Sequence, residues 1–146
     1  SWEIMALAVE KLPYVEHRLQ VRKSFCTLLD DAYNSNPEGA RCALEVIKQM
    51  KHKRFIITPG FLELGEKQEE EQYTLGQEIA DSVDVALLVG RIQTKSIVKG
   101  LQARQFPAQN IYICDSFQEA LSIVQKQADP QDCVLLENDL PDAFNH

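Results

Sequence analysis

Short apolar runs alternate along this chain with longer segments whose apolar residues recur at helical spacing. Four runs are continuously apolar or nearly so, as in strands that other elements cover on both faces: residues 25–29, 54–58, 85–89 and 133–136. Residues 18–23 alternate between apolar and polar, which predicts a half-exposed edge strand, and residues 110–114 form a further short strand. The helical spacing predicts helices over residues 2–12, 37–50, 68–82, 94–105 and 116–128.

Strands and helices follow one another in turn, which is the order of a mostly parallel sheet with helices on both faces. We therefore predict an α/β fold with three layers, six strands and one antiparallel strand at an edge. In such sheets ligands bind at the carboxyl ends of the strands. That edge should collect the polar loops at residues 30–36, 58–65, 90–94, 115 and 137–142.

The loop that ends at Pro37 reads Asp-Asp-Ala-Tyr-Asn-Ser-Asn-Pro and joins a strand to a helix. As a simple turn, it has Asn36 as the helix N-cap and Pro37 at the first helical position. As a ligand loop, it offers Asp31 to a ribose diol and the N–H groups of a helix N-terminus to a phosphate. The amides of Asn34 and Asn36 then also donate to phosphate oxygens, and Tyr33 borders the nucleotide. Both interpretations remain open at this point.

Two further charged residues have a structural and a functional interpretation. Glu63 lies between Leu62 and Leu64, where a carboxylate is either a solvated loop residue or a group that orients a substrate amine. Arg18 begins the alternating strand, and a single arginine on a strand is ordinarily a surface residue.

Composition and charge narrow the classes of function. The 146 residues suit one domain with its own core. A net charge of −7 disfavours sequence-independent binding of nucleic acid. No apolar run is long enough for membrane insertion, and no signal-peptide pattern occurs in these residues. Cysteines and histidines lack the spacing of metal ligands, so we expect no protein-built metal site and reduced thiols in a cytoplasmic protein.

Several well-known catalytic motifs are missing from these residues. There is no Gly-x-Gly-x-x-Gly after the first buried strand, no Gly-x-x-x-x-Gly-Lys-Ser/Thr phosphate loop and no nucleophile elbow. Any chemistry in which the chain takes part therefore needs another domain.

Three segments, in order and with matching spacing over nearly the whole chain, resemble the carboxy-terminal domain of Mur ligases: residues 16–21, 29–37 and 62–65. The resemblance implies a Rossmann-like domain over residues 1–146, with residues 1–13 as the end of a helix that leads from a central ATPase domain. It also implies partners, namely that central domain, an amino-terminal domain, a UDP-linked peptide and an amino acid or dipeptide acceptor such as D-alanyl-D-alanine.

The resemblance further implies a reaction of peptidoglycan precursor synthesis. ATP phosphorylates the carboxylate of the UDP-linked peptide, the acceptor amine attacks the acyl phosphate, and phosphate leaves. ATP is the cofactor, and the central domain binds most of its Mg²⁺. The carboxy-terminal domain binds the acceptor and closes over ATP, which excludes water. It holds no catalytic residue and should be inactive alone, and its ATP-binding positions would be Arg18, Asp31, Tyr33, Asn34 and Asn36.

Two segments depart from the family pattern. Residues 59–61 replace Gly-Asp-Met and remove one carboxylate, and residues 137–140, which begin a polar tail, replace Lys-Gly-Ser-Arg. A basic loop suits the carboxylate of an acceptor, whereas an acidic loop favours an amine or amide. We therefore expect an acceptor other than D-alanyl-D-alanine. The candidate acceptor-binding residues are Glu63, Glu137, Asn138 and Asp139.

Two other functions remain open. The chain could be a non-catalytic binding or regulatory module of a degenerate Mur-like protein, and a Gly-Lys-Thr/Ser loop upstream would argue against that. A stand-alone flavodoxin-like or receiver-like protein fits less well, because a receiver needs a lysine after a late strand and none follows Leu136.

Overall fold

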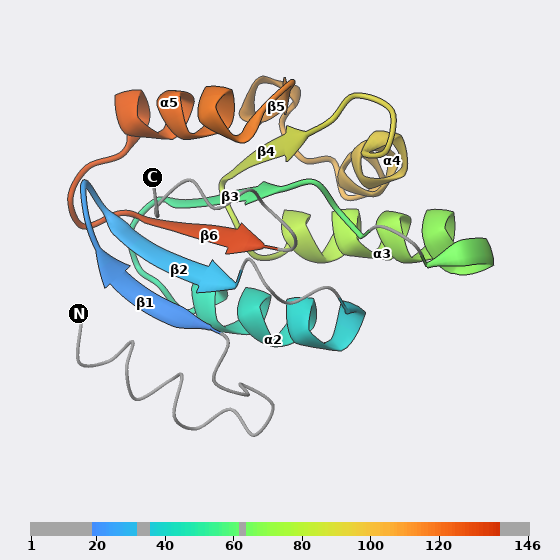
Figure 1. Cartoon of the computed structure of the whole chain (residues 1–146), viewed down its shortest axis with the longest axis horizontal. Helices are drawn as coiled ribbons and strands as arrows, with labels where there is room; N and C mark the ends of the chain where they lie inside the picture. The colour runs from blue at the N-terminus through green and yellow to red at the C-terminus, as the bar shows by residue number, and fades with distance from the viewer. Residues whose placement is uncertain (1–18, 32–35, 62–63, 138–146) are drawn as a thin grey trace.

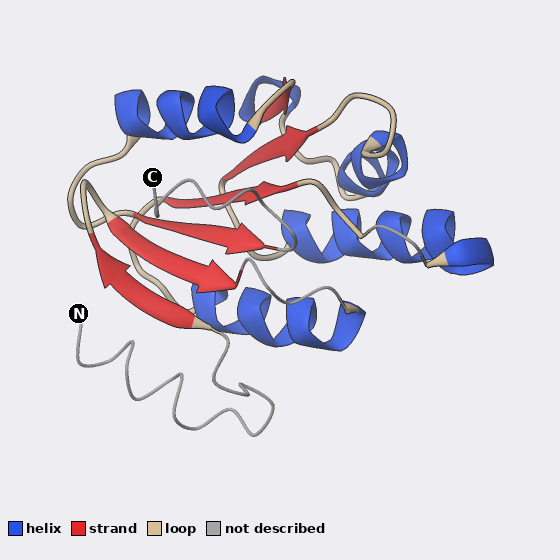
Figure 2. Cartoon of the chain, viewed as in Figure 1, coloured by secondary structure: helices blue, strands red, loops and turns tan. Residues whose placement is uncertain are grey.

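A computed structural model describes residues 19–31, 36–61 and 64–137, whose arrangement is drawn in Figures 1 and 2. The strands are β1 (Gln20–Lys23), β2 (Thr27–Asp31), β3 (Arg54–Thr58), β4 (Val85–Val89), β5 (Ile111–Cys114) and β6 (Cys133–Glu137). The α-helices are α2 (Pro37–Lys48), α3 (Gln68–Ala80), α4 (Lys95–Ala103) and α5 (Phe117–Gln127), and short 3₁₀ helices cover Gly65–Lys67 and Ala108–Asn110. The helix predicted over residues 2–12 lies outside the described residues.

The described strands form one sheet in the order β1-β2-β6-β3-β4-β5. β1 pairs antiparallel with β2 at the edge, and every other pair in this sheet is parallel. The predicted α/β class, with six strands and one antiparallel edge strand, is confirmed.

The direction of each connection decides which face its helix covers. From β2 to β5 the chain moves across the sheet in one direction, and α5 then carries it back to β6, between β2 and β3. Because connections between parallel strands are right-handed, a reversal of direction moves the helix to the opposite face. Accordingly α5 lies on one face, and α2, α3 and α4 pack on the other (Figure 1). The three predicted layers are therefore confirmed.

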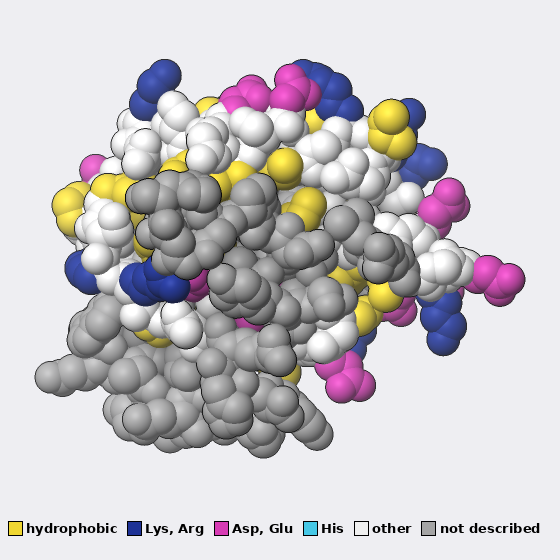
Figure 3. Space-filling view, viewed as in Figure 1, with side chains coloured by type: hydrophobic (Ala, Val, Ile, Leu, Met, Phe, Trp, Pro, Cys, Tyr) yellow, Lys and Arg dark blue, Asp and Glu magenta, His cyan; other side chains and the backbone are white. Residues whose placement is uncertain are grey.

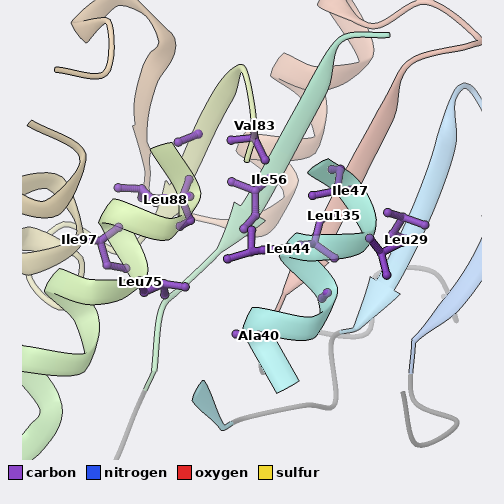
Figure 4. Close-up of a cluster of buried hydrophobic side chains, with 14 of the residues drawn as sticks. Leu29, Ala40, Leu44, Ile47, Ile56, Leu75, Val83, Leu88, Ile97 and Leu135 are labelled. Carbon is purple, nitrogen blue, oxygen red and sulfur yellow. The ribbon is translucent and has the colours of Figure 1, made fainter. Parts of the chain in front are cut away.

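Two apolar clusters fill the spaces between the sheet and its helices. The larger one joins α2, α3 and α4 to one face through residues such as Leu29, Ile56 and Leu135 (Figure 4). The smaller one packs α5, through Phe117, against the other face. β6 serves both, since successive side chains on a strand alternate between faces: Leu135 enters the larger cluster and Leu136 the smaller.

The ends of two strands differ from the sequence-based expectation. The sequence pattern predicts Asp30 and Asp31 in a loop and Glu137 at the start of a polar tail. Both assignments are wrong, since Asp31 is the last residue of β2 and Glu137 the last residue of β6. The reason is mutual pairing, because in the parallel register Asp30 lies beside Leu136 and Asp31 beside Glu137. The residues that carry these carboxyl groups are therefore paired strand residues and not loop residues.

Side chains cap two helices at the predicted positions. Asn36 Oδ1 accepts a hydrogen bond of 2.7 Å from the Gly39 N–H at the start of α2. At the start of α5, Ser116 Oγ accepts from the Glu119 N–H at 3.1 Å, and the Glu119 carboxylate accepts from the Asp115 N–H at 2.8 Å. A cap of this kind is worth about 1 kcal/mol. Asn36 therefore has the structural role that the turn interpretation assigns to it.

All four cysteines are free thiols, as the sequence predicts. Three are buried and Cys42 is half-buried. Burial is the main cause that raises the pKa of Cys26 and Cys133 to about 12 and that of Cys114 to about 11. These thiols are protonated at neutral pH, so they are poor nucleophiles.

Charges of both signs occur on the one face of the molecule that Figure 3 draws. On the face drawn in Figure 3, basic and acidic side chains are interspersed around the periphery. Within the described ranges, no helix combines the length and the apolar character needed to cross a bilayer.

Helices α3 and α4 meet backbone to backbone at two glycines. A Cβ atom on Gly76 would lie 2.1 Å from the carbonyl oxygen of Ile97, and one on Gly100 would lie 2.1 Å from that of Tyr73. Both distances are far below van der Waals contact, so any side chain at either position would push the helices apart.

We expect Gly76→Ala to lower the free energy of unfolding by about 1–3 kcal/mol, because overpacking outweighs the gain in helix propensity. Urea unfolding measures the effect. Gln102→Ala, at an exposed position on α4, is the matched control and should change stability by less than about 0.5 kcal/mol. Equal stability of the two variants would contradict the close packing of these helices.

Candidate functional site

The five strands that run parallel to one another end at the same edge of the sheet. The arrowheads of β2, β3, β4 and β6 point to the same side in Figure 1, α2 begins on that side, and β5 runs parallel to β4. Asp31, Thr58, Val89, Cys114 and Glu137 end these strands. Ligands bind at this edge in open α/β sheets, so it is the candidate functional site.

Asp31 and Glu137 face the same side of the sheet at this edge. They lie opposite one another in the register of β2 and β6. Leu29 and Leu135, two residues earlier on each strand, both enter the cluster under α2, so alternation places the two carboxyl groups on that face as well. Asp30 points to the other face, where it forms an ion pair of 3.1 Å with Arg22.

Both carboxyl groups are removed from water. Asp31 is 2% exposed and Glu137 is 0% exposed. Burial raises the pKa of Glu137 well above its usual value, and the neighbouring carboxyl group of Asp31 raises it further. Asp31 also contributes, after burial, to the raised pKa of Cys42 on α2. The edge therefore contains an acid pair in a site of low dielectric.

Gln72 of α3 connects two loops of this edge. Its Oε1 accepts a hydrogen bond of 2.7 Å from the Phe61 N–H after β3, and its Nε2 donates at 2.8 Å to the carbonyl oxygen of Gln93 after β4. Gly60 has φ +79°, and a Cβ atom there would lie 2.5 Å from the Gln72 amide. The turn that the sequence predicts at residues 59–60 therefore depends on a glycine, and Gln72 fixes its geometry.

The loops after β4 and β5 lead to helices on opposite faces and are joined by a surface ion pair. Arg91 Nε lies 2.9 Å from Asp115 Oδ1, and both side chains are mostly exposed. An exposed pair of this kind adds little stability. Thr94 is more deeply placed, and its hydroxyl donates to the Gly90 carbonyl oxygen at 2.5 Å. Over the described ranges, no group of three His, Cys, Asp or Glu side chains is arranged to hold a metal ion.

The structure describes three of the predicted site residues. Asp31 and Glu137 are brought together, although the sequence assigns one to a nucleotide and the other to an acceptor. Asn36 lies at the same edge as the cap of α2. The predictions for Arg18, Tyr33, Asn34, Glu63, Asn138 and Asp139 fall outside the described residues.

The sequence pattern does not predict that Gln72 is buried at this edge. This residue follows three glutamates in the first turns of α3, where the local pattern predicts a solvated face, yet it is 1% exposed. Its partners come from loops 11 and 21 residues away, and no local signal marks them.

The sequence matches a family model described as Mur ligase, glutamate ligase domain, over residues 17–137. The UDP-N-acetylmuramoyl-tripeptide--D-alanyl-D-alanine ligases of Mycobacterium tuberculosis (strain ATCC 25618 / H37Rv) and Mycobacterium bovis are each 34% identical to it over 98 residues. That match covers 61% of this chain and 19% of each relative, so the chain spans about a fifth of their length.

Solved structures show the same fold. The MurF ligase from Thermotoga maritima, solved in complex with ADP, aligns with a TM-score of 0.69 at 21% identity over 88% of this chain and 28% of that one. A MurF structure from Acinetobacter baumannii aligns with a TM-score of 0.66 at 23% identity and the same coverage.

A mostly parallel sheet with an antiparallel edge strand and helices on both faces is thus the architecture shared with these ligase domains. The match to the family model covers most of the chain. The chain belongs to the Mur ligase family, as a carboxy-terminal (glutamate ligase) domain.

We expect Gln72→Ala to destabilise the fold by about 2 kcal/mol, because it leaves the Phe61 N–H and the Gln93 carbonyl without their partner. Urea unfolding gives the total effect, and amide hydrogen exchange at Phe61 gives the local one. Glu70→Ala, at an exposed position of the same helix, is the control and should leave both nearly unchanged. Unchanged exchange at Phe61 in Gln72→Ala would contradict the bridging role.

Proposed function

We propose that this chain is the acceptor-binding and ATP-closing domain of an ATP-dependent amide ligase of peptidoglycan precursor synthesis. The match to the Mur ligase family over residues 17–137 carries the proposal. The ligase would join an amino acid or dipeptide to a UDP-linked peptide in the cytoplasm. Residues 1–13 would lead from a central domain that binds most of the Mg²⁺ and transfers the phosphoryl group.

The described residues fit part of a nucleotide site. Asp31 supplies a carboxyl group at a strand end, of the kind that accepts hydrogen bonds from ribose hydroxyls. Because this side chain is 2% exposed, a ribose would reach it only after a local rearrangement of the edge, such as closure against the central domain would bring. The first turn of α2 supplies backbone N–H groups and the positive end of a helix dipole, which suit a phosphate. We assign nucleotide contacts to these groups and, by resemblance, to the remaining candidates Arg18, Tyr33, Asn34 and Asn36. Closure against the central domain would complete the site and exclude water.

The acceptor side of the proposal rests on the acidic segment that follows β6. Glu137 is fully buried, so direct contact with an acceptor would fall to Asn138, Asp139 and Glu63. An acidic surface repels a carboxylate and attracts an ammonium group. We therefore propose an acceptor whose recognised end carries an amine or amide.

A non-catalytic binding module is the second candidate. It is favoured by the buried acid pair, because Glu137 occupies a place where the resemblance implies a lysine. A module of this kind would bind nucleotide or a peptide precursor without forming a bond.

The test uses the whole protein that the gene encodes, with ATP, a UDP-linked muramoyl tripeptide and a panel of amines and dipeptides. We expect phosphate release and a ligated product by mass spectrometry only when all three substrates are present. Asp31→Asn should weaken ADP binding in calorimetry by about ten- to hundredfold. Asp115→Asn, at an exposed position of the same edge, is the control and should bind normally.

The outcomes separate the proposals. Nucleotide binding without product for any acceptor would support the binding module and contradict the ligase. A clear preference for D-alanyl-D-alanine would keep the ligase and contradict the proposed acceptor. ATP hydrolysis, or tight ATP binding, by the 146 residues alone would contradict the need for a partner domain.

A further inference from the structure

The carboxyl ends of β2 and β6 bring two acidic side chains into the same buried environment. Asp31 and Glu137 occupy opposed register positions on neighbouring parallel strands. Strands in a sheet lie about 4.8 Å apart, so side chains that share a face at opposed positions are in contact range. The apolar cluster that contains Leu29 and Leu135 lies directly before them on the same face.

Full ionisation of this pair is unfavourable. No described residue donates a hydrogen bond to either carboxylate oxygen of Glu137. Two negative charges at this distance repel strongly when water is excluded, and burial separately disfavours each charge. The groups that act on the pKa of Glu137 include no described lysine or arginine.

Among the described residues, α2 and β3 add no positive charge that is free to pair with Glu137. On α2, Cys42 is a protonated thiol, Glu38 is a further negative charge in the first turn, and Arg41 is bound to Glu78 at 2.7 Å. On β3, Thr58 is neutral, and it accepts a hydrogen bond from the Gly60 N–H. The dipole of α2 favours a negative charge near its start by about 0.3–1 kcal/mol at exposed sites. That supports one carboxylate in this pair, but not two.

We propose that Asp31 and Glu137 share one proton at neutral pH and form a latch between the carboxyl ends of β2 and β6, which loosens when rising pH removes that proton. In the closed latch, the O–H of one carboxyl donates to a carboxylate oxygen of the other. Opening releases the proton to solvent and leaves two adjacent anions. The latch therefore joins the two strand ends after which the chain continues at residues 32 and 138.

The pH dependence follows from the direction of the shift. Glu137 holds its proton to higher pH in the folded chain than in the unfolded chain, so between the two pKa values the folded chain binds more protons. Stability from this group is therefore greatest below its unfolded pKa and falls as the pH rises, until the folded pKa is passed. One proton corresponds to a change of up to about tenfold in the unfolding constant per pH unit.

The experiment is urea unfolding of the chain from about pH 5 to about pH 9, compared with Glu137→Gln and Asp31→Asn. The amide of Gln donates to Asp31 without a titrating proton, so Glu137→Gln should lose the pH dependence and become at least about tenfold more stable than the wild type at high pH. Asp31→Asn should reduce the slope without removing it, because burial, the largest cause of the raised Glu137 pKa, remains. The control Asp115→Asn removes an exposed carboxylate at the same edge and should keep the wild-type slope.

A second measurement covers variants that fail to fold. The ¹³C shift of the Glu137 carboxyl in the wild-type chain should titrate well above the usual range for glutamate. Titration at an ordinary pKa would overturn the latch. So would a wild-type profile parallel to that of Glu137→Gln. Stabilisation at high pH by a divalent cation, absent in Glu137→Gln, would also overturn it, since a metal ion would then replace the proton.

Discussion

The insertion of β6 between β2 and β3 is the constraint on which the rest of the structure depends. The last described strand pairs in parallel with both neighbours and supplies apolar side chains to both faces. Without it, β1 and β2 would be separated from β3, β4 and β5. The return of the chain to this central position also requires α5 to cover the face opposite the other helices.

The same insertion creates the chemistry of the carboxyl edge. A central strand is buried along its whole length, so a polar residue at its end is buried as well. Glu137 therefore lies opposite Asp31 in the register, whereas Arg91 and Asp115, in the segments after β4 and β5, are exposed to water. One end of the edge thus contains a desolvated acid pair and the other a solvated ion pair. A ligand that reaches both ends would encounter very different dielectric environments.

Local sequence patterns were sufficient to predict the helices and strands, but they were insufficient to predict the residues that meet at the candidate site. The apolar runs predicted each described strand to within a few residues, and Asn36 and Ser116 cap helices as expected, because these features depend on neighbours in sequence. Glu137 resembles the start of a polar tail until β2 lies beside it, and Gln72 resembles a solvated residue until two distant loops reach it. The burial and the partners of these two residues depend on strand order and on long-range hydrogen bonds, and neither of these has a local signature in the sequence.

The pairing of Asp31 with Glu137 is tested most directly by a double-mutant cycle on Asp31→Asn and Glu137→Gln, measured by urea unfolding at about pH 8. Either substitution alone removes the repulsion between the two acids, so the second should add little. We predict a coupling energy of about 1 kcal/mol or more. Additive effects would mean that β6 does not bring these two residues together, and would contradict the arrangement of the carboxyl edge.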